Sequence, residues 1–169
     1  LKALTFYADP KKRKNRYKTF RIPKKSGGSR VINAPAKGLN AMLKSLNFAL
    51  HCIVEPHPAA TGFVKEQSIV DNASRHVGKP FVYNIDIQDF FHSFDKSRVK
   101  YAFMCPPFNL SGDREHLAFL LASLCTHPFE VNGQIKRVLP QGSPTSPTLT
   151  NILCSRMDRK LTGLAKRFK

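Results

Sequence analysis

The spacing of the apolar residues changes at Pro35, and this change constrains the fold more than any other feature of the chain. Before it, YKTFRIP (residues 17–23) and RVINAP (residues 30–35) are typical of short strands, and the two glycines between them favour a hairpin tip. After it, apolar side chains recur at helical spacing and predict an amphipathic helix that packs on a core. These side chains are Leu39, Met42, Leu43, Leu46, Leu50 and Ile53.

Three later segments also carry local signals. Residues 66–78 predict a helix that ends at a glycine. The mostly apolar segment KPFVYNIDI, residues 79–87, predicts a buried strand in which Phe81 and Tyr83 belong to the core. FEVNGQIKRVL, residues 129–139, has alternating side chains around an Asn-Gly pair, which favours a second hairpin.

Capping residues predict where the remaining helices begin. Asp95 is expected to cap a helix that runs through Met104, and a further helix is predicted over residues 112–125. The last helix is predicted to have Ser146 as its cap and Pro147 at its first position. Its apolar face would consist of Leu149, Ile152, Leu153, Met157, Leu161 and Leu164.

Positive charge is the strongest global signal. The chain has 28 Lys and Arg residues against 11 Asp and Glu, a net charge of +17, which favours polyanions as partners because neutralised phosphates release counterions. Residues 9–30 alone carry ten of the basic residues and one acid, with Tyr17 and Phe20 between them. A charged run is usually a solvated face. Charge alone would therefore also fit a basic structural or ribosome-associated protein.

Other classes of protein are disfavoured. No apolar stretch approaches the ~20 residues of a membrane span, and the basic N-terminus lacks the apolar segment of a signal peptide. The four cysteines have no CxxC or zinc spacing, so we expect buried or half-buried free thiols in the cytoplasm. The chain begins with Leu1, which indicates a piece of a longer polypeptide.

Asp86 is the first candidate site residue. It follows an apolar segment, and a strand that ends in a carboxylate places that acid rigidly at the edge of a site. The alternative is that Asp86 caps a helix or pairs with a lysine. The segment by itself leaves both interpretations open.

Two further segments suit a phosphate-bearing ligand. Lys24, Lys25 and Arg30 lie at the tip of the predicted hairpin, where cations can hold a triphosphate. In LPQGSPTSPTLTN, Gln141 and Gly142 directly precede a helix N-terminus, whose backbone N–H groups are free to meet an anion. Gly142 has no Cβ and would let a polynucleotide approach closely.

Four segments, taken in order, resemble the motifs of bacterial retron-type reverse transcriptases. FRIPKKSGGSRVINAP and HPAATGFVKEQSIVDNASRHV resemble the first two fingers motifs, YNIDIQDFFHSF resembles motif A, and LPQGSPTSPTLTN resembles motif B. The resemblance extends from about residue 16 to the end of the chain. Retrons, group II introns, diversity-generating elements and phage-defence systems all stay open as the source.

The resemblance implies an α+β fold, namely the fingers and an incomplete palm of a right-hand polymerase, with helices packed on small antiparallel sheets. The fingers would comprise residues 1–80, with the basic hairpin at 17–35, and residues 97–138. The palm would comprise a strand with motif A at residues 81–96 and the motif B loop and helix at residues 139–169. The Tyr-x-Asp-Asp turn of motif C does not occur, and no two acidic residues are adjacent. We therefore expect the chain to be inactive alone and to self-associate through the incomplete palm.

The resemblance also implies an RNA-directed DNA polymerase that acts on an RNA template, a DNA or RNA primer and dNTPs. Asp86 would be a catalytic ligand of Mg²⁺, with Mn²⁺ as a substitute, in a two-metal site. Phe91 would be the sugar gate, whose ring excludes the 2′-OH of an rNTP. The alternative is a non-catalytic RNA-binding module on the same scaffold. The remaining dNTP contacts would be the backbone of Gln88, Asp89 and Phe90, the side chains of Lys24 or Lys25 with Arg30, and Gln141 and Gly142.

Overall fold

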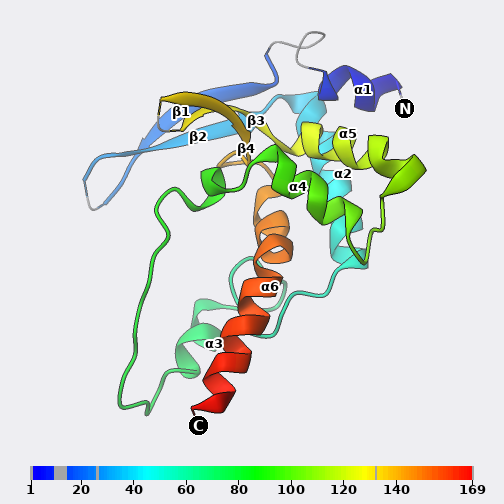
Figure 1. The fold of residues 1–169 in the computed structure, drawn as a ribbon. Coiled ribbons are helices and arrows are strands. Elements are labelled where there is room, and N and C mark those ends of the chain that lie inside the picture. Colours follow the sequence, from blue (N-terminus) through cyan, green and yellow to red (C-terminus); the bar gives the residue numbers. More distant parts are fainter. Residues whose placement is uncertain (1, 10–14, 26, 132, 169) are drawn as a thin grey trace.

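The structure is a computed structural model and describes every residue except 1, 10–14, 26, 132 and 169. Helices and two small sheets alternate along the chain, so the predicted α+β class is confirmed (Figure 1). The helices are α1 (Lys2–Ala8), α2 (Lys37–Ile53), α3 (Ile69–Ser74), α4 (Lys96–Met104), α5 (Glu115–Cys125) and α6 (Ser146–Arg167), with 3-10 turns at Phe90–Ser93 and Gly112–Arg114. The strands are β1 (Tyr17–Pro23), β2 (Ser29–Pro35), β3 (His127–Val131) and β4 (Gln134–Val138).

Each sheet is one antiparallel hairpin, as the turn residues predicted. β1 pairs with β2 from Tyr17 opposite Pro35 to Pro23 opposite Ser29. β3 pairs with β4 and closes where Val131 lies opposite Gln134. Asn132 of the predicted Asn-Gly turn lies outside the described residues.

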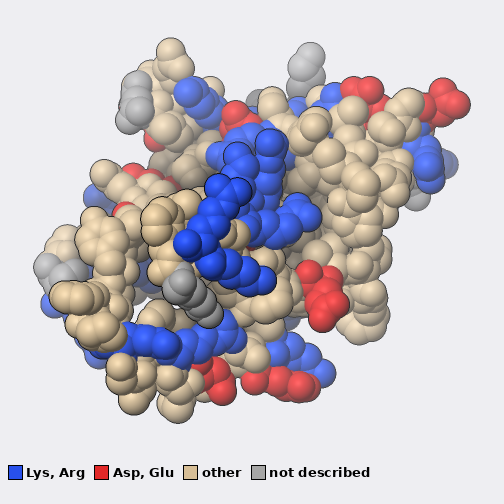
Figure 2. All heavy atoms as spheres, turned by 60° about the horizontal axis from the view of Figure 1, so that its bottom comes forward, with Lys and Arg blue, Asp and Glu red and all other residues tan. Residues whose placement is uncertain are grey.

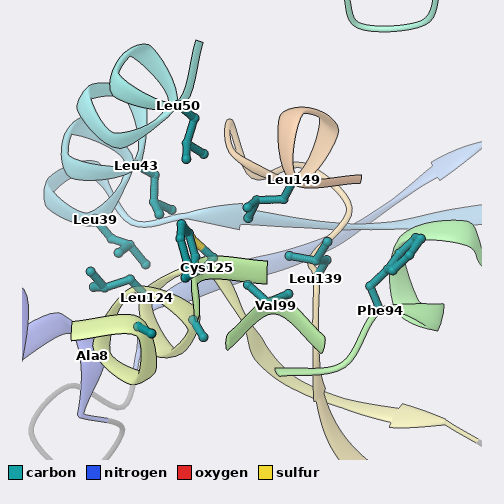
Figure 3. Packing of buried hydrophobic residues seen from close by; sticks show 13 residues of the cluster. Ala8, Leu39, Leu43, Leu50, Phe94, Val99, Leu124, Cys125, Leu139 and Leu149 are labelled. Carbon is teal, nitrogen blue, oxygen red and sulfur yellow. The ribbon is translucent and has the colours of Figure 1, made fainter. Parts of the chain in front are cut away.

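The core lies where α2, α4, α5 and the start of α6 meet (Figure 3). Leu39, Leu43 and Leu50 of α2 are buried, which confirms most of the apolar face predicted after Pro35. Met42 and Leu46 of that face are half-buried, whereas Ile53 is 51% exposed. The predicted cap of α4 is also confirmed, because the Asp95 side chain accepts a hydrogen bond from the Arg98 backbone N–H at 2.8 Å. Local sequence signals therefore placed the helices that build the core.

Two arginines tie both hairpins to the C-terminal end of α5. Arg16, which precedes β1, donates from Nη2 to the carbonyl oxygens of Ser123 at 2.8 Å and Leu124 at 3.1 Å. Arg137 of β4 donates from its own Nη2 to Ser123 and to Thr126, each at 2.9 Å. Carbonyls at a helix C-terminus lack intrahelical partners and carry partial negative charge, which suits these guanidinium groups.

The buried strand predicted over residues 79–87 is wrong. This segment is extended but unpaired, and it forms the long connection between α3 and α4 in Figure 1. Phe81 is 91% exposed and Tyr83 is 87% exposed, so neither belongs to the core as predicted. An apolar segment becomes a buried strand only beside a neighbour that satisfies its backbone, and no strand of the described residues lies alongside it. The helix predicted over residues 66–78 is likewise shorter, because α3 spans only Ile69–Ser74.

The start of α6 is shifted by one residue from the prediction. Thr145 is the N-cap, and the Ser146 hydroxyl instead donates to the Pro140 carbonyl oxygen at 2.7 Å. The first turns of α6 enter the core, where Leu149 is buried. Farther along, Leu161 and Leu164 are about half exposed, so the apolar face is only partly covered.

The four cysteines differ in their exposure. All four thiols are free. Cys125 is buried and Cys105 and Cys154 are half-buried as predicted, whereas Cys52 is exposed. Among the described residues, no helix is both long and apolar enough to cross a membrane.

Candidate functional site

A cleft of about 270 Å³ opens between the β1–β2 hairpin and the turn Phe90–Ser93. The side chains that line it come from the hairpin, that turn, β3 and the loop before α6. The fold thereby brings together six of the residues predicted from separate motifs: Lys24, Arg30, Asp89, Phe90, Phe91 and Gln141.

The hairpin supplies the positive charge. Lys24 directly follows β1, and its backbone N–H donates to the Gly28 carbonyl oxygen at 3.1 Å, which closes the tip. Arg30 lies on β2 opposite Ile22. Neither cation forms an ion pair with any acid that the structure describes. Lys25 is exposed and does not line the cleft, so the geometry separates the two lysines that the sequence left equivalent.

Aromatic rings form the opposite wall. Asp89 adopts a left-handed backbone, with φ 48°, at the start of the 3-10 turn that carries Phe90 and Phe91. The Phe90 ring lies 5.2 Å from the Phe94 ring, edge to face, and packs against the core. The Phe91 ring lies 5.6 Å from Phe90 and 6.1 Å from Phe63, so neighbouring rings fix its orientation.

The loop before α6 forms the third side and is joined directly to the hairpin. The Gln141 carbonyl oxygen accepts a hydrogen bond from the Asn33 backbone N–H at 2.7 Å. Gly142 has φ +115°, and a Cβ built on it would lie 2.8 Å from Cγ2 of Ile32. Gly142 does not line the cleft. Its missing side chain therefore permits close packing on β2, a reason different from the polynucleotide approach suggested by the sequence.

Five residues that line the cleft were not among the predicted site residues, namely Ser29, Val31, Ile87, His92 and Phe129. His92 is buried and stacks on Phe129 of β3, with ring centroids 3.9 Å apart and planes 18° apart. Burial lowers the pKa of His92, and its Nε2 has no hydrogen-bond partner. The stack joins the 3-10 turn Phe90–Ser93 to strand β3. A sequence pattern within either segment gives no signal for a contact between them.

Asp86 and Gln88 lie outside the cleft and are exposed. Nowhere in the described chain do three or more His, Cys, Asp or Glu side chains gather in a metal-binding group. Mg²⁺ takes near-octahedral oxygen coordination, to which one carboxylate contributes little. The described residues therefore do not fit a complete divalent-metal site, although Asp86 could contribute one ligand to it.

Most of the chain matches a known family. The sequence model of the family described as reverse transcriptase (RNA-dependent DNA polymerase) matches residues 22–167. The chain belongs to the reverse transcriptase family. Every residue that lines the cleft, from Lys24 to Gln141, lies within the range that matches this family.

Several curated relatives of the chain are retron reverse transcriptases. It is 36% identical over 165 residues to the Retron Mx65 reverse transcriptase of Myxococcus xanthus, covering 94% of this chain and 38% of that protein. It is 37% identical over 164 residues to the Retron Mx162 reverse transcriptase of the same organism, covering 89% and 32%. The Retron Ec86 reverse transcriptase of Escherichia coli is 32% identical over 152 residues, covering 89% and 43%. The resemblance to retron-type enzymes is confirmed, and the chain spans less than half the length of these relatives.

Proposed function

We propose that the chain is the nucleotide-binding part of an RNA-directed DNA polymerase of bacterial retron type. The observation that carries this proposal is the cleft, in which two unpaired cations, two phenylalanines and Gln141 meet although they come from three separate motifs. The substrates would be an RNA template, a DNA or RNA primer and a dNTP. The proposed division is fingers at residues 1–80 and 97–138, with palm elements at residues 81–96 and 139–169.

Lys24 and Arg30 would hold the β- and γ-phosphates of the dNTP. Both are exposed at the hairpin tip and have no described acid as a partner, so their charge is available to a ligand. The planar guanidinium of Arg30 can bind two phosphate oxygens at once, whereas the Lys24 ammonium acts as a point charge. The backbone N–H groups of Gln88, Asp89 and Phe90 would add neutral donors to the same phosphates.

Phe91 would select the sugar. Its ring lines the cleft and is held by Phe90 and Phe63, so it cannot swing aside freely when a 2′-OH approaches. Gln141, fixed to β2 through its carbonyl oxygen, would contact the nascent base pair, and Gly142 would lie beside it. The choice of sugar and of base pair would therefore depend on the rigid walls of the cleft more than on its charge.

Asp86 would provide one ligand to Mg²⁺, or to Mn²⁺ in its place, and the other ligands would have to come from outside the described residues. When bound, such ions would activate the primer 3′-OH and stabilise the leaving pyrophosphate. We infer that the chain is inactive by itself. Because Asp86 lies on an exposed, unpaired segment, a strand partner for residues 79–87 would be needed to fix its position.

Exposed apolar side chains on this same segment and on α6 lead us to propose self-association of the chain. Phe81, Tyr83, Ile85 and Leu161 are all more than half exposed. Burial of such surface is favourable by about 25 cal/mol per Å². Light scattering coupled to size-exclusion chromatography should show an apparent mass that rises with concentration, and a constant monomer mass would contradict this proposal.

Primer extension tests the polymerase assignment. The full-length polypeptide, given an RNA template, a primer, dNTPs and Mg²⁺, should extend the primer, and Asp86→Ala should abolish extension. Asp113→Ala is the matched control, because Asp113 is an exposed acid in a separate turn. Extension by Asp86→Ala at the wild-type rate would remove Asp86 from the site. Tight RNA binding without any extension by the wild type would favour the non-catalytic RNA-binding module.

A further inference from the structure

A second, larger pocket lies between the C-terminal end of α2, α4 and the first half of α6. Its volume is about 920 Å³, and it shares no lining residue with the nucleotide cleft. We call it the α4–α6 pocket. The polymerase roles proposed above use none of its side chains.

Positive charge dominates the polar part of the α4–α6 pocket. Arg98 of α4 and Arg156 and Arg159 of α6 line it, and Glu55 is the one carboxylate among its lining residues. None of the three arginines forms an ion pair with an acid that the structure describes. The Arg98 guanidinium lies over the Phe94 ring at 4.7 Å and donates to the Ser93 carbonyl oxygen at 3.3 Å, so its position is fixed. Three uncompensated guanidinium groups around one pocket favour an anionic ligand.

The lining also contains apolar side chains and one exposed aromatic ring, beside uncharged polar groups such as Thr148 and Asn151. Ile152 and Leu153 of α6 and Ala102 of α4 contribute aliphatic surface. Tyr101 belongs to the lining and is 67% exposed, so one part of its ring is open to a ligand. The nucleotides of a nucleic acid suit this combination, because a base can stack on an aromatic ring while arginines bind the phosphates of the backbone.

The charge continues beyond the pocket along α6. Arg156, Lys160 and Arg167 recur at intervals of four and seven residues and so share one face, with Arg159 and Lys166 beside them. Asp158 is the only acid of α6. Lys and Arg side chains gather in a band on the face that Figure 2 turns toward the viewer, where the C-terminal end of α6 lies. From Arg156 to Arg167 the helix rises by roughly 17 Å, the length of about five nucleotides at 3.4 Å each.

We propose that the α4–α6 pocket and the basic face of α6 form a second binding site for single-stranded nucleic acid, separate from the nucleotide cleft. The arginines bind phosphates, Tyr101 stacks on a base, and the stripe along α6 continues the contact over several nucleotides. An acidic polypeptide would satisfy the arginines but would leave the exposed ring without a stacking partner. The site would hold a strand of template or product away from the point of nucleotide addition.

Salt-dependent binding of a fluorescent, unstructured RNA 12-mer to the full polypeptide tests this site. Arg98→Gln, Arg156→Gln and Arg159→Gln combined should weaken binding at least about tenfold and reduce the slope of log K against log salt by about 2, since each phosphate contact on a single strand contributes about 0.7. The matched control combines Lys2→Gln, Lys37→Gln and Lys44→Gln, which removes the same charge from exposed positions outside both pockets. An equal loss of RNA affinity in the two triple variants would show that only net charge matters, and it would overturn the proposal.

Three further measurements separate the site from its alternatives without any need for polymerase activity. Tyr101→Ala should weaken RNA binding by about fivefold or more at an unchanged salt slope, and Tyr101→Phe should restore it. A saturating dNTP should leave RNA binding unchanged, and displacement of the RNA would show that the two sites are one. Poly-glutamate of equal charge should compete poorly, and equal competition would contradict a nucleic-acid site.

Discussion

The backbone N–H of Asn33 donates a hydrogen bond to the carbonyl oxygen of Gln141 at 2.7 Å, which joins the basic hairpin to the loop before α6. The Asn33 side chain is buried at this junction, and its Oδ1 accepts a hydrogen bond from the Thr19 hydroxyl at 2.8 Å. One short contact thus fixes the hairpin cations relative to the Gln141 side of the cleft.

Replacement of Gly142 by alanine should lower the free energy of unfolding by about 1–3 kcal/mol. The new Cβ would lie 2.8 Å from Cγ2 of Ile32, and the backbone has φ +115°. Urea unfolding followed by circular dichroism measures the change. Gly163→Ala is the control of opposite sign: Gly163 lies within α6 with open space around it, so alanine should stabilise the protein by about 0.5–1 kcal/mol. Equal effects at both positions would contradict the packing role of Gly142.

Lys24→Ala should raise the KM for dNTP by about tenfold in primer extension, whereas Lys25→Ala should leave it near the wild-type value. Lys24 lines the cleft, and Lys25, one residue farther along the same tip, does not. Steady-state kinetics in which one dNTP is varied measure the KM of both variants. The two variants lose the same charge, so a larger effect at Lys25 would show that the tip adopts another conformation when it binds the triphosphate.

Phe91→Val should let the polymerase incorporate rNTPs, with a loss of sugar selectivity on the order of tenfold to a hundredfold. A smaller side chain leaves room for the 2′-OH on the cleft wall. The ratio of kcat/KM for dNTP and rNTP measures the effect. Phe48→Val is a suitable control, because Phe48 is 73% exposed on α2 and does not line the cleft. Unchanged selectivity in Phe91→Val would refute the sugar-gate assignment.

The protein should lose stability as the pH falls from about 7 toward 4. Burial, with smaller contributions from His92, Arg137 and Arg16, lowers the pKa of His127 to about 4, below its ordinary value of 6.5. The unfolded chain therefore binds a proton in this range that the folded chain does not, which costs up to about 3 kcal/mol of stability. The lowered pKa of His92 acts in the same direction.

Urea unfolding at a series of pH values measures this dependence. His127→Gln should flatten the curve between pH 7 and pH 4, whatever its effect on stability at neutral pH. His76→Gln is the control for the replacement of an exposed histidine. A curve of the same slope in His127→Gln would assign the acid sensitivity to other groups.

Much of the fold followed from local signals. The glycines near Gly28 and the apolar spacing from Leu39 to Leu50 act over a few residues, and the hairpin and helix that they predict are present. The cap of α4 by Asp95 could also be predicted, because its hydrogen-bond partner is only three residues away. The exposed segment at residues 79–87 shows where prediction from local sequence fails. Its apolar composition suits a strand, but the pairing of a strand depends on a neighbour that is distant in sequence.

The sequence by itself determined the α+β class, both hairpins, the family and the identities of most cleft residues. Only the tertiary structure decided that Lys24 faces the cleft and Lys25 does not, that His92 stacks on Phe129, and that Gly142 packs on Ile32. Turn and helix signals are contacts between near neighbours in the chain, which a sequence displays directly. The cleft depends on contacts between residues far apart in the chain, and their geometry exists only once α5 holds both hairpins through Arg16 and Arg137.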